Sequence, residues 1–298
     1  MKTFVTLVIF VFATALSCFS QSRLDSLINL RKTDFLGGKL PTWYTPGHEQ
    51  AAADFQQVIT DAITYYENRY SVQFQVKLIV LDSSQWLTEI LPYGFVFFGR
   101  GWIVMNAGMD YATFKKVYKT EQYVNELDAA LAREHVMPET MITAFLKFYS
   151  IHELGHYFLG KLTNAKSPDA WTGEFSASYF AYEFLLNNRP AELKPFELFC
   201  QADKDYYNPL FSSIADFNQK YTGTGVENYL WYHSNFYFLV KALYTCHRQN
   251  FVPMFERNFP KSATSTFTTE DIITILDVGC RGSVQKWVAE LETRARKR

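Results

Sequence analysis

Two hydrophobic patterns follow one another in the early part of the chain. After Pro46-Gly47, apolar residues recur every three or four positions up to Tyr66, which predicts a helix with one apolar face. Over residues 73–81 apolar residues alternate with others, which predicts a strand. Two shorter apolar segments, 95–98 and 102–105, flank a turn that contains two glycines. We expect them to form a pair of short strands.

From residue 110 onward the apolar spacing becomes helical and stays helical. Pro138 suits the first turn of a long helix that reaches about residue 162. A second helix is expected over 172–188, where Pro190 ends it. Further helices are expected near 191–205, 208–220, 226–248, 268–278 and 283–296. Strands early and helices late predict an α+β architecture, with a small N-terminal sheet before about residue 136 and a mainly helical half after it.

The first residues are predicted to be a secretory signal peptide. Lys2 precedes an apolar run over residues 4–16, and small and polar residues follow it. This run is shorter than the ~20 residues of a membrane-spanning helix. We expect cleavage near Ser20, which leaves residues 21–298 as a single domain that is periplasmic, extracellular or at the cell surface. An uncleaved N-terminal anchor and a lipid anchor at Cys18 are the alternatives. No later apolar run is long enough to span a bilayer.

Composition excludes several classes of protein. The 298 residues are 48% hydrophobic and 20% charged, which excludes a disordered or collagen-like chain. The 29 basic residues balance 30 acidic ones, and no basic block exists that could neutralise a run of phosphates. We therefore expect no nucleic-acid partner. The aromatic content of 17% is high, and it indicates either a bulky core or aromatic subsites for a ligand.

Three cysteines remain in the predicted mature chain: Cys200, Cys246 and Cys280. An exported protein can form disulfides, so one pair and one spare thiol are expected. The sequence does not choose the pair. Their wide spacing argues against a cysteine metal site, which usually needs two cysteines close together in the chain.

The long central helix carries the sequence His-Glu-Leu-Gly-His over residues 152–156. Residues four apart lie on one face of a helix, so His152 and His156 can bind one zinc ion together. Glu153 is then placed to take a proton from the zinc-bound water. The alternative is a helix that presents two histidines to solvent or to the core. A lone histidine is usually structural, and His48, His135 and His247 are interpreted in that way.

A catalytic zinc site needs a third protein ligand. A histidine six residues after the second one is excluded, because Leu162 stands there. The other option is a glutamate on the following helix, and Glu174 fits it. Small residues share its helical face and would allow close packing against the histidine helix: Ala177, Ser178 and Ala181.

Other functions for these residues stay open. Ser178 can support a ligand with a hydrogen bond. The alternative for Glu174 is a first-turn glutamate that is favoured by the helix dipole. Three further carboxylates are weaker candidates for the ligand: Asp169, Glu183 and Glu192.

His-Glu-Leu-Gly-His, followed by a helix with Glu174 and the Ala-Ser pair at 177–178, resembles the gluzincin clan of zinc metallopeptidases, which includes thermolysin-like enzymes. Residues 174–186 also resemble a helix of bacterial repressor-cleaving zincins, which are cytoplasmic, unlike the exported chain expected here. The resemblance covers these two helices. It implies a zincin-like fold and one Zn²⁺ on His152, His156 and Glu174, with Glu153 as the base. Ser178 departs from the family pattern, in which an acidic residue often stands four positions after the glutamate ligand.

The resemblance also implies where substrate would bind. Zincins of this type place an edge strand above the metal helix, and the substrate backbone pairs with it. Residues 102–107 are the best candidate, with Trp102, Val104 and Asn106 as substrate contacts. An ordinary core strand is the alternative. Related enzymes stabilise the oxyanion with a tyrosine or histidine from a later helix. Tyr229 and His233 are the candidates, and aromatic core packing is their alternative role.

The leading hypothesis is thus a secreted or periplasmic zinc metallopeptidase, with a peptide or protein as its substrate. Water activated by Glu153 would attack the peptide carbonyl. A catalytically inactive zincin scaffold that binds a peptide or glycan is the alternative. Substrate preference and oligomeric state cannot be predicted from the sequence.

Overall fold

The computed structural model describes residues 32–85, 95–99, 101–116, 120–264 and 266–293. The chain divides into two compact units. The first contains the chain up to residue 64 together with 75–109, and the second contains 65–74 and 110–298. The predicted signal peptide and Cys18 lie outside the described residues. Within the described ranges, no helix combines the length and apolarity needed to cross a membrane.

The first unit contains a five-stranded mixed sheet with strand order β1-β2-β3-β5-β4. The two inner pairs, β2–β3 and β3–β5, are parallel, whereas the two outer pairs are antiparallel. The α+β class and the small mixed sheet are therefore confirmed. The strand bounds are β1 Asp34–Leu36, β2 Thr42–Tyr44, β3 Lys77–Leu81, β4 Val96–Gly99 and β5 Trp102–Asn106.

The prediction that residues 102–107 form an edge strand is wrong. Strand β5 lies between β3 and β4, so neighbouring strands occupy both of its hydrogen-bonding edges. Trp102 and Val104 are buried in a core cluster. The Asn106 side chain accepts hydrogen bonds from Ser83 Oγ at 3.2 Å and Gly108 N at 3.0 Å. The β4 hairpin covers the edge that a substrate backbone would need.

Helix α2 (Glu49–Tyr70) begins just after Pro46-Gly47, as predicted, and buries its apolar face. Gln56 Nε2 donates to the Leu40 carbonyl at 2.8 Å, which ties the helix to the segment before β2. A short helix, α3 (Ser83–Gln85), follows β3. Strand β3 is shorter than predicted, because the segment before residue 77 does not pair in the sheet.

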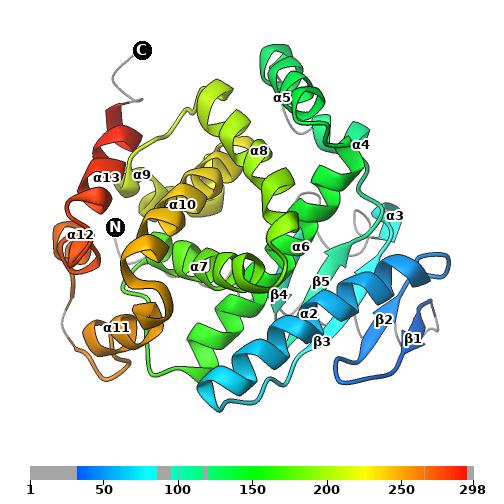
Figure 1. Cartoon of the computed structure of the whole chain (residues 1–298), viewed down its shortest axis with the longest axis horizontal. Coiled ribbons are helices and arrows are strands. Elements are labelled where there is room, and N and C mark those ends of the chain that lie inside the picture. Colours follow the sequence, from blue (N-terminus) through cyan, green and yellow to red (C-terminus); the bar gives the residue numbers. More distant parts are fainter. Residues whose placement is uncertain (1–31, 86–94, 100, 117–119, 265, 294–298) are drawn as a thin grey trace, which may run out of the picture. The chain divides into compact units, whose positions relative to one another are not determined.

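Apart from one isolated β-bridge, the secondary structure in the described part of the second unit is all helical (Figure 1). Helix α11 was not predicted, because its eight residues are fewer than the window over which a helical period can be recognised. The long central helix predicted from the sequence consists of α6 and a π-helical turn, η2, that directly follows it. The helix bounds are α4 Tyr111–Lys115, α5 Glu121–Arg133, α6 Pro138–Tyr157, η2 Phe158–Leu162, α7 Ala170–Asn188, α8 Pro190–Tyr206, α9 Ile214–Lys220, η3 Tyr221–Thr224, α10 Val226–His247, η4 Arg248–Asn250, α11 Phe251–Asn258, α12 Thr269–Asp277 and α13 Ser283–Thr293.

Four long helices form the core of this unit. Helices α6 and α10 each pack against both α7 and α8. Aromatic rings fill the space between them: Phe148 stacks on Phe196 with ring centroids 4.0 Å apart. The largest side chains that are fully buried are all aromatic, from Trp171 and Trp231 to Phe158. Much of the high aromatic content is therefore core packing.

A disulfide links Cys246, near the end of α10, to Cys280, between α12 and α13. Their Cα atoms lie 5.2 Å apart, within the usual range for a disulfide. Cys200 is buried and unpaired. The structure thus selects one of the pairings that the sequence left open. Closing a loop of this length stabilises a fold by about 3–4 kcal/mol in the chain-entropy model.

Candidate metal centre

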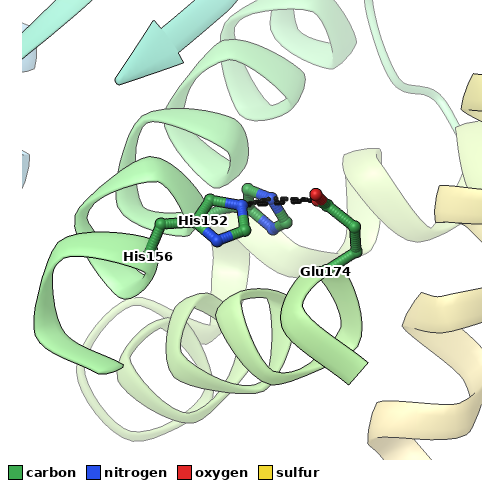
Figure 2. A group of neighbouring side chains, drawn as sticks. All are labelled: His152, His156 and Glu174. Carbon is green, nitrogen blue, oxygen red and sulfur yellow. Dashed lines mark hydrogen bonds and ion pairs between the residues drawn. The ribbon is translucent and has the colours of Figure 1, made fainter. Parts of the chain in front are cut away.

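Helix α6 presents its two histidines on one face, one turn apart. Pro138 occupies the first turn, where its missing N–H costs no hydrogen bond. In Figure 2 both imidazoles lie on the same side of the helix, and their Nε2 atoms are 3.1 Å apart. The His152 side chain is 2% exposed, whereas the His156 side chain is 30% exposed. The pair therefore opens to solvent on the His156 side.

Close packing between α6 and α7 brings Glu174 to the histidines. A Cβ atom at Gly155 would lie 2.9 Å from the carbonyl oxygen of Ala177 and 3.0 Å from its Cα. Both are backbone atoms, so a side chain at this position would force the helices apart. Asp169 begins α7 with a capping box. The prediction that small residues allow close packing here is confirmed.

The three predicted ligand atoms converge on one point. Glu174 Oε2 lies 3.1 Å from His152 Nε2 and 3.3 Å from His156 Nε2. Ligand atoms bound tetrahedrally at about 2.0–2.1 Å from one ion lie about 3.3 Å apart. The observed separations fit that spacing. His152, His156 and Glu174 therefore form a group that can hold one metal ion. Two imidazoles and one carboxylate suit zinc, and they also suit iron.

Ser178 supports the first histidine from α7. Its Oγ lies 3.0 Å from His152 Nδ1. When Nε2 of a histidine binds a metal, Nδ1 carries the proton and needs an acceptor, and the Ser178 hydroxyl is placed to supply one. A serine four positions after Glu174 thus contacts the first histidine.

Helix α10 places His233 beside the carboxylate but outside the group of mutually close ligand atoms. Its Nε2 lies 3.6 Å from Glu174 Oε2. Neither ring nitrogen has a hydrogen-bond partner, although the side chain is 2% exposed. Buried polar groups normally have partners, so His233 is placed to bind a group that enters the site. The Tyr229 ring lies 4.3 Å from the His233 ring.

Tyr221 joins the site without any sequence signal. It follows α9 directly, and its hydroxyl donates a hydrogen bond to Glu174 Oε1. A side-chain hydrogen bond also links it to Tyr229. Burial and the Glu174 carboxylate raise the pKa of Tyr221, so its hydroxyl stays protonated. It lies 47 residues from Glu174, and no spacing rule connects them.

Glu153 lies on α6 next to the first histidine and is partly buried. Its carboxylate acts on the charge balance of the site, because it raises the pKa of His156, Tyr221 and Tyr229 among other influences. The predicted base is therefore close enough to the cluster for direct electrostatic interaction.

Burial and neighbouring charges together set the ionisation of the side chains in the site. Burial alone would raise the pKa of the Glu174 carboxyl, but the adjacent imidazoles outweigh it and hold that pKa well below its usual range. Burial lowers the pKa of His152 to about 4 and that of His233 to about 3. Burial also acts against the charged form of His156, but the Glu174 carboxylate raises that pKa to about 9. His156 is thus the one protonated imidazole of the three at neutral pH.

The weaker ligand candidates have other partners. Asp169 caps α7, and Glu183 pairs with Arg69 at 2.8 Å. Glu192 pairs with Lys147 at 2.9 Å. None of the three belongs to the group that can hold a metal within the described residues. Among the acidic candidates named from the sequence, Glu174 alone joins the histidines.

Comparisons with known proteins identify no family for this chain. No known family model matches the chain. No curated protein matches it. The assignment therefore rests on the residues themselves: a buried carboxylate and two imidazoles from two packed helices, placed together so that they can hold one metal ion.

Proposed function

We propose that this protein is an exported zinc-dependent peptidase of the gluzincin type. One observation carries the proposal. His152, His156 and Glu174 converge as a possible metal site, and Glu153 follows the first ligand on the same helix. A metal-binding site needs no glutamate at that position, whereas hydrolysis needs a base beside the attacking water.

Each residue of the site has a chemical task in this proposal. Zinc, when bound, would polarise the substrate carbonyl and acidify water. Glu153 takes the proton from the attacking water and passes it to the leaving amine. His233 donates a hydrogen bond to the carbonyl oxygen as negative charge develops there. Its low pKa keeps it neutral, with one ring N–H to donate and no internal partner that competes for it.

Export is supported by two independent features. The N-terminal residues carry the signal pattern described above. The Cys246–Cys280 disulfide is typical of proteins in oxidising compartments. A protease activity outside the cytoplasm is consistent with both.

The test compares Glu153→Gln with a matched surface change, Glu290→Gln on α13. Glu153→Gln keeps the ligand set but loses the base, so hydrolysis of a diverse peptide library should fall about 10²–10⁴-fold. Bound zinc, measured by elemental analysis, should stay equal to that of the wild type. Glu290→Gln should change neither quantity. A chelator should abolish wild-type hydrolysis.

The alternative is a scaffold that binds zinc and a peptide or glycan without cleaving it. Ser178 departs from the family pattern, but it contacts His152 directly, so this departure gives the alternative no support. A wild-type protein that binds zinc stoichiometrically, cleaves no peptide, and binds library members would establish the scaffold role instead.

A further inference from the structure

The two oxygens of the Glu174 carboxylate have different partners. Oε2 faces the imidazoles of His152, His156 and His233 at 3.1, 3.3 and 3.6 Å. Oε1 accepts the hydrogen bond from the Tyr221 hydroxyl. The Glu174 side chain is 5% exposed, so solvent can hardly replace this hydrogen bond. One oxygen is turned towards the ligand nitrogens, and a phenol engages the other.

Tyr221 holds this position with an unfavourable backbone conformation. At the end of α9 it has φ 49° and ψ −120°, a region that residues with a side chain avoid. Such conformations persist only where surrounding contacts maintain them, and they cluster at functional sites. The Tyr221 ring packs against Phe217 and Tyr229, with centroids 5.6 and 5.7 Å away. The local structure therefore directs the hydroxyl to Glu174 at the expense of backbone geometry.

We propose that Tyr221 is a positioning residue that restricts Glu174 to one metal-binding oxygen. The inference rests on the metal site of the proposed function. A hydrogen bond donated to Oε1 engages that oxygen and orients the carboxylate with Oε2 towards the ion. Glu174 then contributes one ligand atom, and the site keeps the three protein ligands and the open position of a catalytic zinc centre.

Without the phenol, the freed oxygen could bind the ion as well. A carboxylate that binds through both oxygens is common for calcium, which takes six to eight ligands. Tyr221 would thus influence both the affinity and the choice of metal, although it does not touch the ion. Contacts that orient ligands in this way typically change metal affinity 10- to 100-fold when removed.

The test is Tyr221→Phe, which removes the hydroxyl and keeps the ring that packs against Phe217. Tyr206→Phe is the matched control. Tyr206 is similarly exposed, at 42% against 37% for Tyr221, and lies on α8 away from the ligand set. Zinc affinity is measured by competition with a chelating dye. Cobalt(II) replaces zinc in a second measurement, because its visible absorption is strong in four-coordinate sites and weak in six-coordinate ones.

We expect Tyr221→Phe to bind zinc about 10- to 100-fold more weakly and to show a weaker cobalt band. Tyr206→Phe should match the wild type in both measurements. Equal affinity and equal cobalt spectra for Tyr221→Phe and wild type would overturn the inference. A purely structural role for Tyr221 would lower thermal stability and leave the cobalt spectrum of the folded protein unchanged, which also counts against it.

X-ray absorption of the zinc-loaded wild-type protein tests the same point without a variant. One carboxylate oxygen in the zinc shell supports the inference, and two overturn it. Failure of the proposed peptidase function looks different: the wild type then binds zinc and cleaves nothing, while the effect of Tyr221→Phe on metal binding stands. A wild type that binds no metal overturns both proposals.

Discussion

Helix α7 carries two buried glutamates, and different groups compensate the negative charge of each. Glu183 pairs with a cation of the chain itself, the guanidinium of Arg69, at 2.8 Å. Glu174 lies among three imidazoles and a phenol, and no arginine or lysine pairs with it in the described residues. A buried carboxylate needs a compensating positive charge. Glu183 has an arginine, which stays charged at any pH near neutrality, whereas Glu174 has the protonated His156 imidazole, whose proton a metal ion can displace.

The pKa values of the two carboxyls express this difference. Burial raises the pKa of Glu183 to about 7, and its Arg69 partner offsets only part of that effect. The pKa of Glu174 is held well below its usual range despite burial, because the neighbouring imidazoles favour its charge. A carboxylate kept ionised beside a protonated imidazole, whose proton a metal ion can displace, is suited to metal binding. The comparison thus separates a structural ion pair from a candidate functional site on one helix.

The largest expected effect breaks the structural pair. Arg69→Met leaves Glu183, whose side chain is 2% exposed, without its cation, and should lower the free energy of unfolding by up to about 3–5 kcal/mol above about pH 7, where this carboxyl is ionised in the wild type. Denaturant titration measures this loss. The loss should shrink as the pH falls below about 7, the pKa of Glu183 in the folded protein, because the protonated carboxyl no longer needs the cation. Zinc affinity should not change, and a large change would contradict the separation of the two glutamates.

Replacing the other glutamate should give the opposite profile. Glu174→Gln removes the charged ligand and should weaken zinc binding by at least about 100-fold, more than the loss of an outer contact. Glu183→Gln is the matched variant on the same helix and should keep the wild-type zinc affinity. Competition with a metal-binding dye measures both. Similar losses in the two variants would mean that the cluster does not select Glu174.

A variant at the contact between α6 and α7 tests whether the metal cluster depends on how closely the two helix backbones approach each other. Gly155→Ala places a Cβ against the backbone of Ala177 and should cost about 1–3 kcal/mol of stability, with a loss of zinc affinity as Glu174 moves away. Gly160→Ala is the control, because a Cβ at Gly160 meets nothing within 4 Å. Thermal unfolding of both variants, with and without zinc, measures the effect. Unchanged zinc binding in Gly155→Ala would show that the helices can separate without loss of the site.

The last expected effect is a gradual pH dependence. The pKa of His156 is raised to about 9 in the metal-free protein, so zinc must displace one proton, and its affinity should rise roughly tenfold per pH unit from about pH 7 to 9. The same raised pKa stabilises the metal-free fold fully below about pH 6.5, and this contribution is lost as the pH rises to about 9. Calorimetry of metal-free and zinc-loaded protein should show the loss in the metal-free sample alone. A flat affinity profile would contradict a protonated His156.

Parts of the site that depend on residues close together in the sequence could be predicted, whereas parts that depend on contacts between distant segments could not. His152 and His156 could be paired from the sequence, because helical spacing alone places them on one face. Glu174 could be proposed because small residues on its face permit close packing, and Gly155 completes that contact. Tyr221 could not be found, because its bond to Glu174 depends on where α9 ends in space. No sequence pattern indicates where the end of α9 lies relative to Glu174.

The fold shows the same division. Strands 96–99 and 102–106 were recognisable from apolar runs and turn glycines, but their order in the sheet was not. The prediction of an edge strand at 102–107 failed because every strand has the same local signal, whether one or two neighbours pair with it. The helical half was predicted almost completely, because helix formation depends on periodicity within the segment. Helix α11 was missed, since its eight residues are fewer than the window over which a helical period can be recognised.

By itself, the sequence of this protein determined most of its helices, the strands near residues 77–81, 96–99 and 102–106, and the histidine pair with its adjacent glutamate. These features depend on the spacing of residue types along the chain, which can be taken directly from the sequence. Only the tertiary structure decided which carboxylate joins the histidines, which cysteines form the disulfide, and which glutamate forms an ion pair with an arginine. Each of those choices is a contact between distant segments, and such contacts depend on how side-chain volumes and backbone surfaces pack together.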